Sequence, residues 1–260
     1  MDNRGVGIFD SGVGGMTVLK ELQKNMPNEK YIYIGDTASF PYGSKSKNTI
    51  IELCKKRIEN LIDLNVKIIV IACGTATSQA LEEMQKMFNI PIIGIIEPTV
   101  KYLKEKEIKN VGIIATAGTI RSKGWENKIK QLICNVHIES KACPLLAPMA
   151  EEGWTENEIA KLAIHEYLKD FKNIDALILG CTHYPLFEKL IMEELKNVET
   201  INTGKMVATE LRRYLDEHNM RNASAEGKNT EIYLTDLECN FVNVAKNLLN
   251  EENLDLKKIE

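Results

Sequence analysis

Four short stretches decide the fold of this chain. Residues 6–11 read Val-Gly-Ile-Phe-Asp-Ser, and residues 111–116 read Val-Gly-Ile-Ile-Ala-Thr. Each is later followed by an apolar run that ends at a cysteine: residues 71–75 read Ile-Ala-Cys-Gly-Thr, and residues 179–183 read Leu-Gly-Cys-Thr-His. The first cysteine lies 67 residues after the start of its half, and the second lies 70 residues after the start of the other. This spacing indicates an internal repeat of two similar half-molecules.

Apolar runs alternate along the chain with stretches of helical periodicity. The apolar runs cover residues 6–9, 31–34, 68–71, 92–96, 111–114, 176–179 and 198–201. Helical spacing is clearest over residues 49–64, 78–88 and 156–171. Continuously apolar strands that alternate with helices are typical of a mostly parallel sheet covered on both faces. The sequence therefore predicts an α/β protein, with an exposed loop over residues 219–229 and a solvated helix or tail over residues 251–260.

Composition narrows the possible partners. The chain has 260 residues, a formal net charge of −4 and 44% hydrophobic residues, which is enough for one large core or two smaller ones. It has 33 Lys and Arg against 37 Asp and Glu, without the clustered basic excess that nucleic acids or membrane surfaces require. No apolar run approaches the roughly 18–20 residues that span a bilayer. Because residues 1–4 lead directly into strand-like sequence, we expect no signal peptide and a soluble, cytoplasmic protein.

The six cysteines divide into two groups. They include no CxxC pair and no short chelating interval with a histidine, so we expect neither a disulfide framework nor a metal site. Cys73 and Cys181 each follow a strand and precede a helix, at the sheet edge where open α/β folds place their ligands. Two such halves facing each other would place one thiol on either side of a shared cleft. The others are interpreted as packing residues: Cys54, Cys134, Cys143 and Cys239.

The two thiols have both a chemical and a structural interpretation. A cysteine after a strand is often a packing residue, but two at corresponding places in a repeat favour catalysis. A helix N-terminus lowers the pKa of a thiol from about 8.5, which makes a thiolate accessible near neutrality. His183 stands two residues after Cys181, where it can bind the substrate, tune the thiol or simply be a satisfied polar residue. The remaining histidines are expected to be structural or exposed: His137, His165 and His218.

Three further segments contain polar groups for a site. Residues 10–17, a glycine-rich turn after a strand, either bind a carboxylate or phosphate or are structural, and Asp10 either caps the turn or acts in catalysis or amine binding. Residues 36–44 form a loop in which Tyr42 and Ser44 offer hydroxyls to a polar ligand, although the segment alone is only a turn. Glu151 and its neighbour Glu152 are either solvated or reach the cleft.

Four segments together resemble the signatures of glutamate racemase, within the cofactor-independent aspartate/glutamate racemase superfamily. They are Gly-Ile-Phe-Asp-Ser-Gly-Val-Gly-Gly at residues 7–15, Pro-Tyr-Gly at 41–43, Ala-Cys-Gly-Thr-Ala at 72–76 and Gly-Cys-Thr-His-Tyr-Pro at 180–185. The resemblance extends from the first strand to about Asp236. It implies two α/β domains related by a pseudo-twofold axis, with the active site between them. We place the first domain at residues 1–97 plus 208–260 and the second at residues 98–207.

The resemblance also implies a mechanism and a set of site residues. Cys73 and Cys181 would be the acid–base pair: one thiolate removes the substrate's α-proton while the other thiol protonates the opposite face. Inversion at carbon needs a base and an acid on opposite sides, and donors around the carboxylate stabilise the carbanion. Asp10, Glu151 and His183 would assist the thiols or the substrate ammonium. The residues implied in substrate binding are Asp10, Ser11, Tyr42, Gly43, Gly74, Thr75, Thr182 and His183.

Two positions depart from the family pattern. Gly74 stands where the family usually has asparagine. The glycine keeps a backbone N–H but lacks the side-chain amide of asparagine. Asn202 replaces an aspartate expected in a later strand. The leading hypothesis is a glutamate racemase that supplies D-glutamate for peptidoglycan synthesis and cell shape, and family members are often homodimers. The alternatives are a racemase of aspartate or another amino acid, prompted by Gly74, and a non-catalytic amino-acid-binding relative.

Overall fold

The computed structural model describes residues 1–222, 230–237, 239–249 and 254–260. Its strands form two sheets, and every strand pairing within these residues is parallel. The six-stranded sheet contains β1 (Val6–Asp10), β2 (Tyr31–Gly35), β3 (Ile68–Ile71), β4 (Ile92–Gly94), β9 (Thr230–Leu234) and β10 (Leu256–Lys258). The four-stranded sheet contains β5 (Asn110–Ala115), β6 (His137–Ala142), β7 (Ala176–Leu179) and β8 (Glu199–Asn202). The α/β class with parallel sheets is confirmed.

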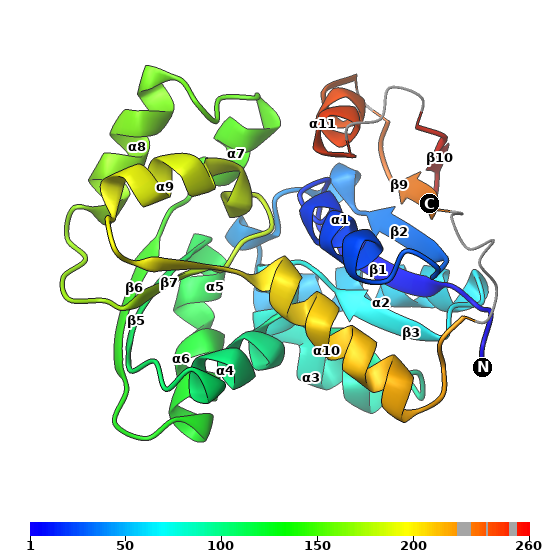
Figure 1. The fold of residues 1–260 in the computed structure, drawn as a ribbon. Helices are drawn as coiled ribbons and strands as arrows, with labels where there is room; N and C mark the ends of the chain where they lie inside the picture. The colour runs from blue at the N-terminus through cyan, green and yellow to red at the C-terminus, as the bar shows by residue number, and fades with distance from the viewer. Residues whose placement is uncertain (223–229, 238, 250–253) are drawn as a thin grey trace.

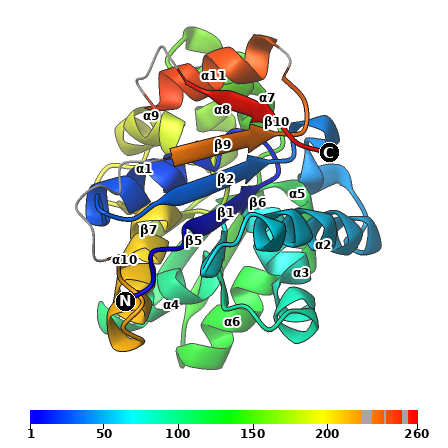
Figure 2. The same ribbon diagram turned by 90° about the vertical axis from the view of Figure 1, so that its right-hand side faces the viewer.

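The strand orders reveal the repeat directly. The larger sheet runs β10-β9-β2-β1-β3-β4 and the smaller sheet runs β6-β5-β7-β8. Figure 1 shows the two sheets in separate parts of the molecule, and Figure 2 shows β10, β9, β2 and β1 side by side. The arrangement β2-β1-β3-β4 therefore has the same order as β6-β5-β7-β8, with β9 and β10 added at one edge of the first half. In each half the strand order reverses at the first strand, and such reversal points are where open α/β sheets bind ligands.

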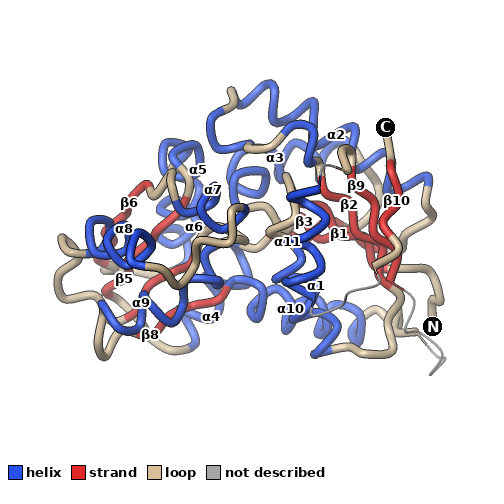
Figure 3. The backbone as a smooth tube through the Cα atoms, turned by 90° about the horizontal axis from the view of Figure 1, so that it is seen from above, coloured by secondary structure: helices blue, strands red, loops and turns tan. Residues whose placement is uncertain are grey.

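Helices cover both faces of each sheet. Around the larger sheet lie α1 (Met16–Asn25), α2 (Lys47–Asp63), α3 (Gly74–Met87) and α11 (Cys239–Leu249). The second half contains α5 (Ala117–Ser122), α6 (Gly124–Leu132), α7 (Leu146–Glu151), α8 (Glu158–Leu168) and α9 (Glu188–Glu194). Two helices join the halves, α4 (Ile96–Glu105) and α10 (Thr203–Glu217), and α10 packs against both α1 and α4 (Figure 1). Seen from above, the two sheets stand apart with helices between them (Figure 3).

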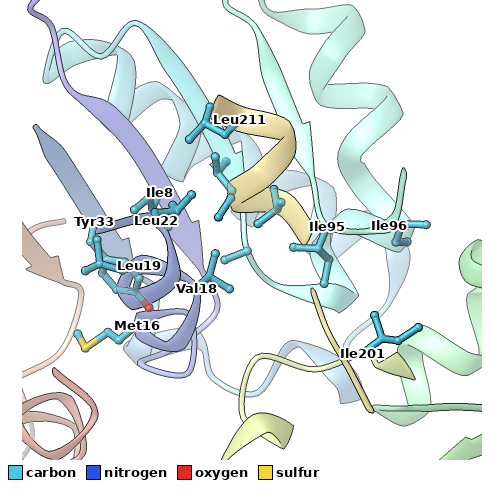
Figure 4. Packing of buried hydrophobic residues seen from close by; sticks show 14 of the residues in the cluster. Ile8, Met16, Val18, Leu19, Leu22, Tyr33, Ile95, Ile96, Ile201 and Leu211 are labelled. Atoms are coloured by element: carbon cyan, nitrogen blue, oxygen red, sulfur yellow. The ribbon is translucent and has the colours of Figure 1, made fainter. Parts of the chain in front are cut away.

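One hydrophobic core is continuous between the halves. It contains Ile8 and Tyr33 of the larger sheet, Leu19 of α1, Leu211 of α10 and Ile201 of the smaller sheet (Figure 4). Two further clusters lie on the outer faces, one beneath α2 and α3 and the other beneath α7, α8 and α9. Alternate residues of the central strands thus face different clusters, which is why β3 and β7 are apolar throughout.

Some boundaries differ from the sequence predictions. The run at residues 92–96 forms a strand only to Gly94, because Ile96 already begins α4. Residues 256–258, predicted as helix or tail, form β10, whose backbone pairs with β9. The predicted loop at 219–229 lies largely outside the described residues, as do residues 251–253. The predicted domain boundaries fall within α4 and α10 and stay a prediction.

Candidate active site

Both cysteines line one small cavity between the two sheets. Ser11 follows β1, Cys73 follows β3, Thr116 follows β5 and Cys181 follows β7, so the four come from corresponding strand ends. The complete lining is Ser11, Phe40, Pro41, Tyr42, Gly43, Cys73, Gly74, Thr75, Thr116, Ala147, Gly180, Cys181, Thr182 and His183. The cavity volume is about 20 Å³, enough for roughly one water molecule. The walls must therefore separate before an amino acid can bind.

Cys73 is held in place by hydrogen bonds at the start of α3. Its Sγ accepts from the backbone N–H of Ala76 at 3.5 Å and donates to Ser11 Oγ at 3.4 Å. Burial, reinforced by the charge of Asp10, raises the pKa of the Cys73 thiol to about 12, although the hydrogen bonds with Ser11 and Ala76 oppose the rise. The expectation of a lowered pKa at this helix N-terminus is therefore wrong for Cys73 in this closed cavity, because desolvation outweighs the helix amides.

Cys181 lies in a chain of polar contacts with His183 and Glu151. His183 Nδ1 is 3.8 Å from Cys181 Sγ, and His183 Nε2 is 2.6 Å from Glu151 Oε1, at the end of α7. Burial opposes a charged imidazole, but the hydrogen bonds with Cys181 and Glu151 raise the pKa of His183 well above its usual value. The raised pKa favours the protonated ring, which can donate from both nitrogens. Phe40 packs against its face, with 5.7 Å between ring centroids.

The glycine-rich turn holds Asp10 rather than presenting its amides to the cavity. The carboxylate accepts from the N–H of Gly12 at 3.0 Å, from the N–H of Gly15 and from Thr182 Oγ1 at 3.2 Å. Asp10 is fully buried behind the cavity wall, and burial raises its pKa while the charge of His183 opposes the rise. Asp10 thus reaches the cavity through Thr182, and the anion held by the turn is the chain's own carboxylate.

Close packing explains why two of the residues in this turn are glycines. A Cβ on Gly14 would lie 2.5 Å from the ring of His183, and a Cβ on Gly15 would lie 2.5 Å from Asp10 Cβ. Neither approach leaves room for a side chain, and the approach of Gly14 to His183 joins the two halves. The motif therefore brings the backbone of the first half against the histidine of the second.

The loop after β2 contributes to the cavity differently from the prediction. Tyr42 lines the cavity, but its hydroxyl donates to Asp36 Oδ2 at 2.6 Å, and Thr235 donates to the other oxygen of Asp36. The Ser44 hydroxyl donates to the backbone oxygen of Pro41, and Ser44 is exposed and does not line the cavity. The hydroxyls predicted to face a ligand are therefore used in holding the loop.

A group of threonines crosses between the two halves. Thr75 Oγ1 lies 2.8 Å from Thr116 Oγ1 and 3.1 Å from Thr119 Oγ1, and the last two are 2.9 Å apart. Sequence reasoning missed Thr116 as a site residue. The signal was present, because Thr116 occupies in the second half of the repeat the position that Ser11 occupies in the first.

Gly74 lies against the backbone of the other half. A Cβ built on Gly74 would be 2.1 Å from the carbonyl oxygen of Gly180, the residue before Cys181. No side chain fits at position 74 in this arrangement, so the glycine does more than omit an amide. It permits the first turn of α3 to approach the end of β7. Ala147, which no sequence motif contained, also lines the cavity, as do three residues of the quoted segments that were not named as site residues: Phe40, Pro41 and Gly180.

The other cysteines and histidines lie outside the cavity. Cys54 and Cys143 are buried, as predicted for packing residues, but Cys134 is exposed because it lies in the turn between α6 and β6. The side chain of Cys239 lies outside the described residues. The three histidines predicted to be structural or exposed are all exposed: His137, His165 and His218.

Three remaining predictions concern single residues or metals. Asn202 begins α10 as its N-cap, since its Oδ1 accepts from the N–H of Gly204 at 2.9 Å, and it does not line the cavity. Glu152 is exposed, unlike Glu151. Within the described ranges, no group of three or more Cys, His, Asp or Glu side chains is arranged to hold a metal ion. The described helices include none that is long and apolar enough to span a membrane.

The architecture and the thiols first define a class: α/β proteins in which two parallel sheets each present one cysteine to a shared cavity. Residues 16–211 match the family described as Asp/Glu/Hydantoin racemase. The chain belongs to this family.

Within the family, its relatives include many glutamate racemases. That of Aquifex aeolicus is 42% identical over 250 residues, which is 95% of this chain and 94% of the relative. The crystal structure of glutamate racemase from Francisella tularensis in complex with D-glutamate is 36% identical, with a TM-score of 0.94 over 100% of this chain and 98% of that one. The Thermus thermophilus glutamate racemase in complex with beta-chloro-D-alanine is 32% identical, with a TM-score of 0.90 over the same shares.

Proposed function

We propose that this protein interconverts L- and D-glutamate without a cofactor, using Cys73 and Cys181 as its acid–base pair. The observation that carries the proposal is the placement of these two thiols on corresponding strands of two sheets, around one cavity. The substrate is proposed from the relatives, which carry the name glutamate racemase, and from the D-glutamate in one similar structure.

The proposed chemistry is two proton transfers at the substrate's α-carbon. One sulfur, as thiolate, takes the α-proton, and the electron pair of the C–H bond stays on carbon, delocalised into the carboxylate. The other sulfur, as thiol, then gives its proton to the opposite face. One thiolate and one thiol remain with their roles exchanged, which suits the reverse reaction. A single group would return the proton to the face from which it came.

The surroundings of the sulfurs support different resting states for the two. Because its pKa is raised, Cys73 holds its proton in the closed cavity, where it is the proposed acid. The protonated His183, fixed by Glu151, can donate a hydrogen bond to Cys181 as the sulfur takes up negative charge. The substrate ammonium would add a positive charge near both sulfurs, and Asp10 is proposed to assist through Thr182.

The remaining cavity residues are proposed to bind the substrate. Ser11, Thr75 and Thr182 offer hydroxyls, and Gly43 and Gly74 offer backbone groups at the wall. Donors aimed at the carboxylate stabilise the carbanion as charge develops on it. Tyr42 and His183 complete the proposed set, Tyr42 through its ring and backbone, because its hydroxyl is bound to Asp36.

The proposal extends to the role of the product. We propose that the D-glutamate enters peptidoglycan synthesis in the cytoplasm and that the enzyme acts as a homodimer. Expression of the protein should restore growth of a bacterial strain that depends on added D-glutamate. Sedimentation at enzyme concentrations used for assays tests the assembly state.

Solvent isotope exchange tests the activity. In D₂O, deuterium should enter the α-position as circular dichroism reports loss of optical activity of L-glutamate. Cys73→Ala and Cys181→Ala should each abolish racemisation, whereas the exposed Cys134→Ala should retain it with unchanged folding. Full activity in both cavity variants would refute the two-thiol mechanism.

The alternative functions predict different results. A racemase of another amino acid would turn over aspartate or a further substrate far faster than glutamate in a substrate panel. A non-catalytic relative would bind glutamate in calorimetry without any α-proton exchange. The aspartate racemase structure from Picrophilus torridus is only 19% identical, so it shares the fold and gives the aspartate alternative no further support.

A further inference from the structure

A second, basic recess lies beside the active-site cavity. Its volume is about 330 Å³, far larger than that of the cavity between the thiols. Residues from the segment after Tyr42, from α3 and from α5 surround it. The lining consists of Lys45, Ser46, Lys47, Ser78, Gln79, Gly118, Arg121 and Ser122.

The charge of this recess is wholly positive. Lys45, Lys47 and Arg121 line it, and no Asp or Glu does. Across the part of the chain that the structure describes, none of these three cations forms a salt bridge. Three such cations around one hollow are unexpected in a chain with a net charge of −4, because neighbouring like charges repel. An anionic ligand would relieve that repulsion.

The recess adjoins a larger hollow of different charge. The two share Lys47, Ser78, Gln79 and Ser122, but the larger hollow is also lined by acidic residues, among them Glu82 and Glu97. Glu97 forms ion pairs with Lys101 and Lys128 there. The adjoining hollow is therefore mixed in charge, and of these two neighbours only the recess has a lining without acidic residues.

Three segments contribute to both the recess and the active site. On α3, Thr75 lines the active-site cavity and Gln79 lines the recess. At α5, Thr116 lines the active-site cavity and Arg121 lines the recess. Gly43 lines the active-site cavity, and Lys45, two residues later, lines the recess. The recess is thus separated from the thiols only by the place where these three segments meet.

The separating wall is a contact between the two halves of the molecule. A Cβ on Gly118 of the second half would lie 2.6 Å from the carbonyl oxygen of Gly43 in the first half. Gln79 Nε2 donates to the carbonyl oxygen of Gly118 at 3.2 Å. Because the active-site cavity holds only about one water, its walls must part to admit an amino acid. Parting along this contact joins the cavity to the recess.

We propose that the basic recess is an admission site that binds the side-chain carboxylate of an incoming dicarboxylic amino acid before the wall opens. The proposal rests on the proposed function and adds a selection step outside the cavity. Glutamate carries a net charge of −1, whereas alanine carries none, so a positive recess concentrates glutamate at the wall. Electrostatic steering of this kind raises association rates by about 10- to 1,000-fold, and salt screens it.

The kinetic test removes the three charges together. We expect the variant Lys45→Gln/Lys47→Gln/Arg121→Gln to lose about tenfold in kcat/KM for glutamate at low ionic strength, with kcat unchanged. The decline of kcat/KM with added potassium chloride should be strong in the wild-type enzyme and nearly absent in this variant. A kcat/KM within twofold of wild type, with the same salt dependence, would overturn the proposal.

A matched control separates local from global charge. Lys55, Lys56 and Lys130 are exposed, and their replacement with Gln changes the net charge by the same amount away from the recess. This control variant should keep the wild-type kcat/KM and salt dependence. An equal loss in the control would show that overall charge, rather than the recess, attracts the substrate, and would refute the proposal.

A binding measurement tests the recess without relying on racemisation. Titration calorimetry with inorganic phosphate should detect one site in the wild type and at least tenfold weaker binding in the recess variant, even if the protein has no racemase activity. Equal phosphate binding by both proteins would refute an anion site here. Loss of phosphate binding with unchanged kcat/KM for glutamate would refute the admission role.

Discussion

Replacing Gly74 with alanine tests how closely the two halves must approach for catalysis. The new Cβ would lie 2.1 Å from the carbonyl oxygen of Gly180, whereas ordinary contacts begin near 3.4 Å. The two atoms must therefore move apart by about 1 Å. Both belong to backbone anchored at a sheet edge, one starting α3 and the other ending β7, so neither can yield alone. The shift must separate the edges that carry the thiols.

The expected cost to catalysis follows from this displacement. Misplacing reacting groups by about 1 Å costs on the order of 100-fold in rate, which corresponds to about 2.7 kcal/mol of transition-state free energy. We therefore expect kcat/KM of Gly74→Ala to fall about 100-fold. Overpacking should also lower the free energy of unfolding by about 1–3 kcal/mol. Circular dichroism measures both, from the optical activity of glutamate and from urea denaturation.

A glycine elsewhere provides the control. A Cβ on Gly5, before β1, would meet only the flexible end of Ile32 at 3.2 Å and the backbone oxygen of Lys30 at 3.5 Å. Gly5→Ala should therefore keep wild-type activity. If Gly74→Ala folds and its kcat/KM stays within twofold of wild type, the close approach of the two halves is not needed for catalysis and the reasoning fails.

The remaining predictions concern ionisable groups. Glu151→Gln removes the charge that helps raise the pKa of His183, so the alkaline limb of the kcat profile should move to lower pH; an unmoved limb would exclude this role. Because the pKa of Cys73 is about 12 when folded and about 8.5 when unfolded, its contribution to stability is complete below pH 8.5 and is lost as pH rises toward 12. Alkaline denaturation of Cys73→Ala should therefore show a shallower decline, by up to about 1.4 kcal/mol per pH unit. Lys67→Met leaves the buried carboxylate of Glu29 without its 2.7 Å partner and should cost about 3–5 kcal/mol in urea denaturation, and adding Glu29→Gln should recover part of this; no recovery would contradict the assignment.

The sequence predicted the fold well because its strands are buried on both faces. All seven predicted strands are present, and the spacing of the two cysteine motifs anticipated the matching strand orders of the two sheets. Strand β9 was not predicted, and the last strand, β10, could not be predicted in this way. It is short, polar and half-buried, and it forms because its backbone pairs with β9.

The sequence predicted those site residues that lie both in the internal repeat and in a recognisable motif. Cys73 and Cys181 line one cavity, as expected, since corresponding strand ends face each other. The hydroxyl of Tyr42 and the amides around Asp10 were harder to assign, because their partners come from the chain's own fold. The sequence shows that a hydrogen-bond donor is present, but it does not show whether another group of the protein already accepts its hydrogen bond.

By itself, the sequence determined the α/β class, the duplication and the identity of the two thiols, because these depend on periodicity and on residue type at fixed intervals. Only the tertiary structure decided the electrostatics and the space around them. The pKa of Cys73 rises because long-range packing removes water from its thiol, which no local pattern records. The contact of Gly74 with Gly180 and the gathering of three cations beside the cavity likewise depend on segments that are distant in sequence and meet only when the two halves pack.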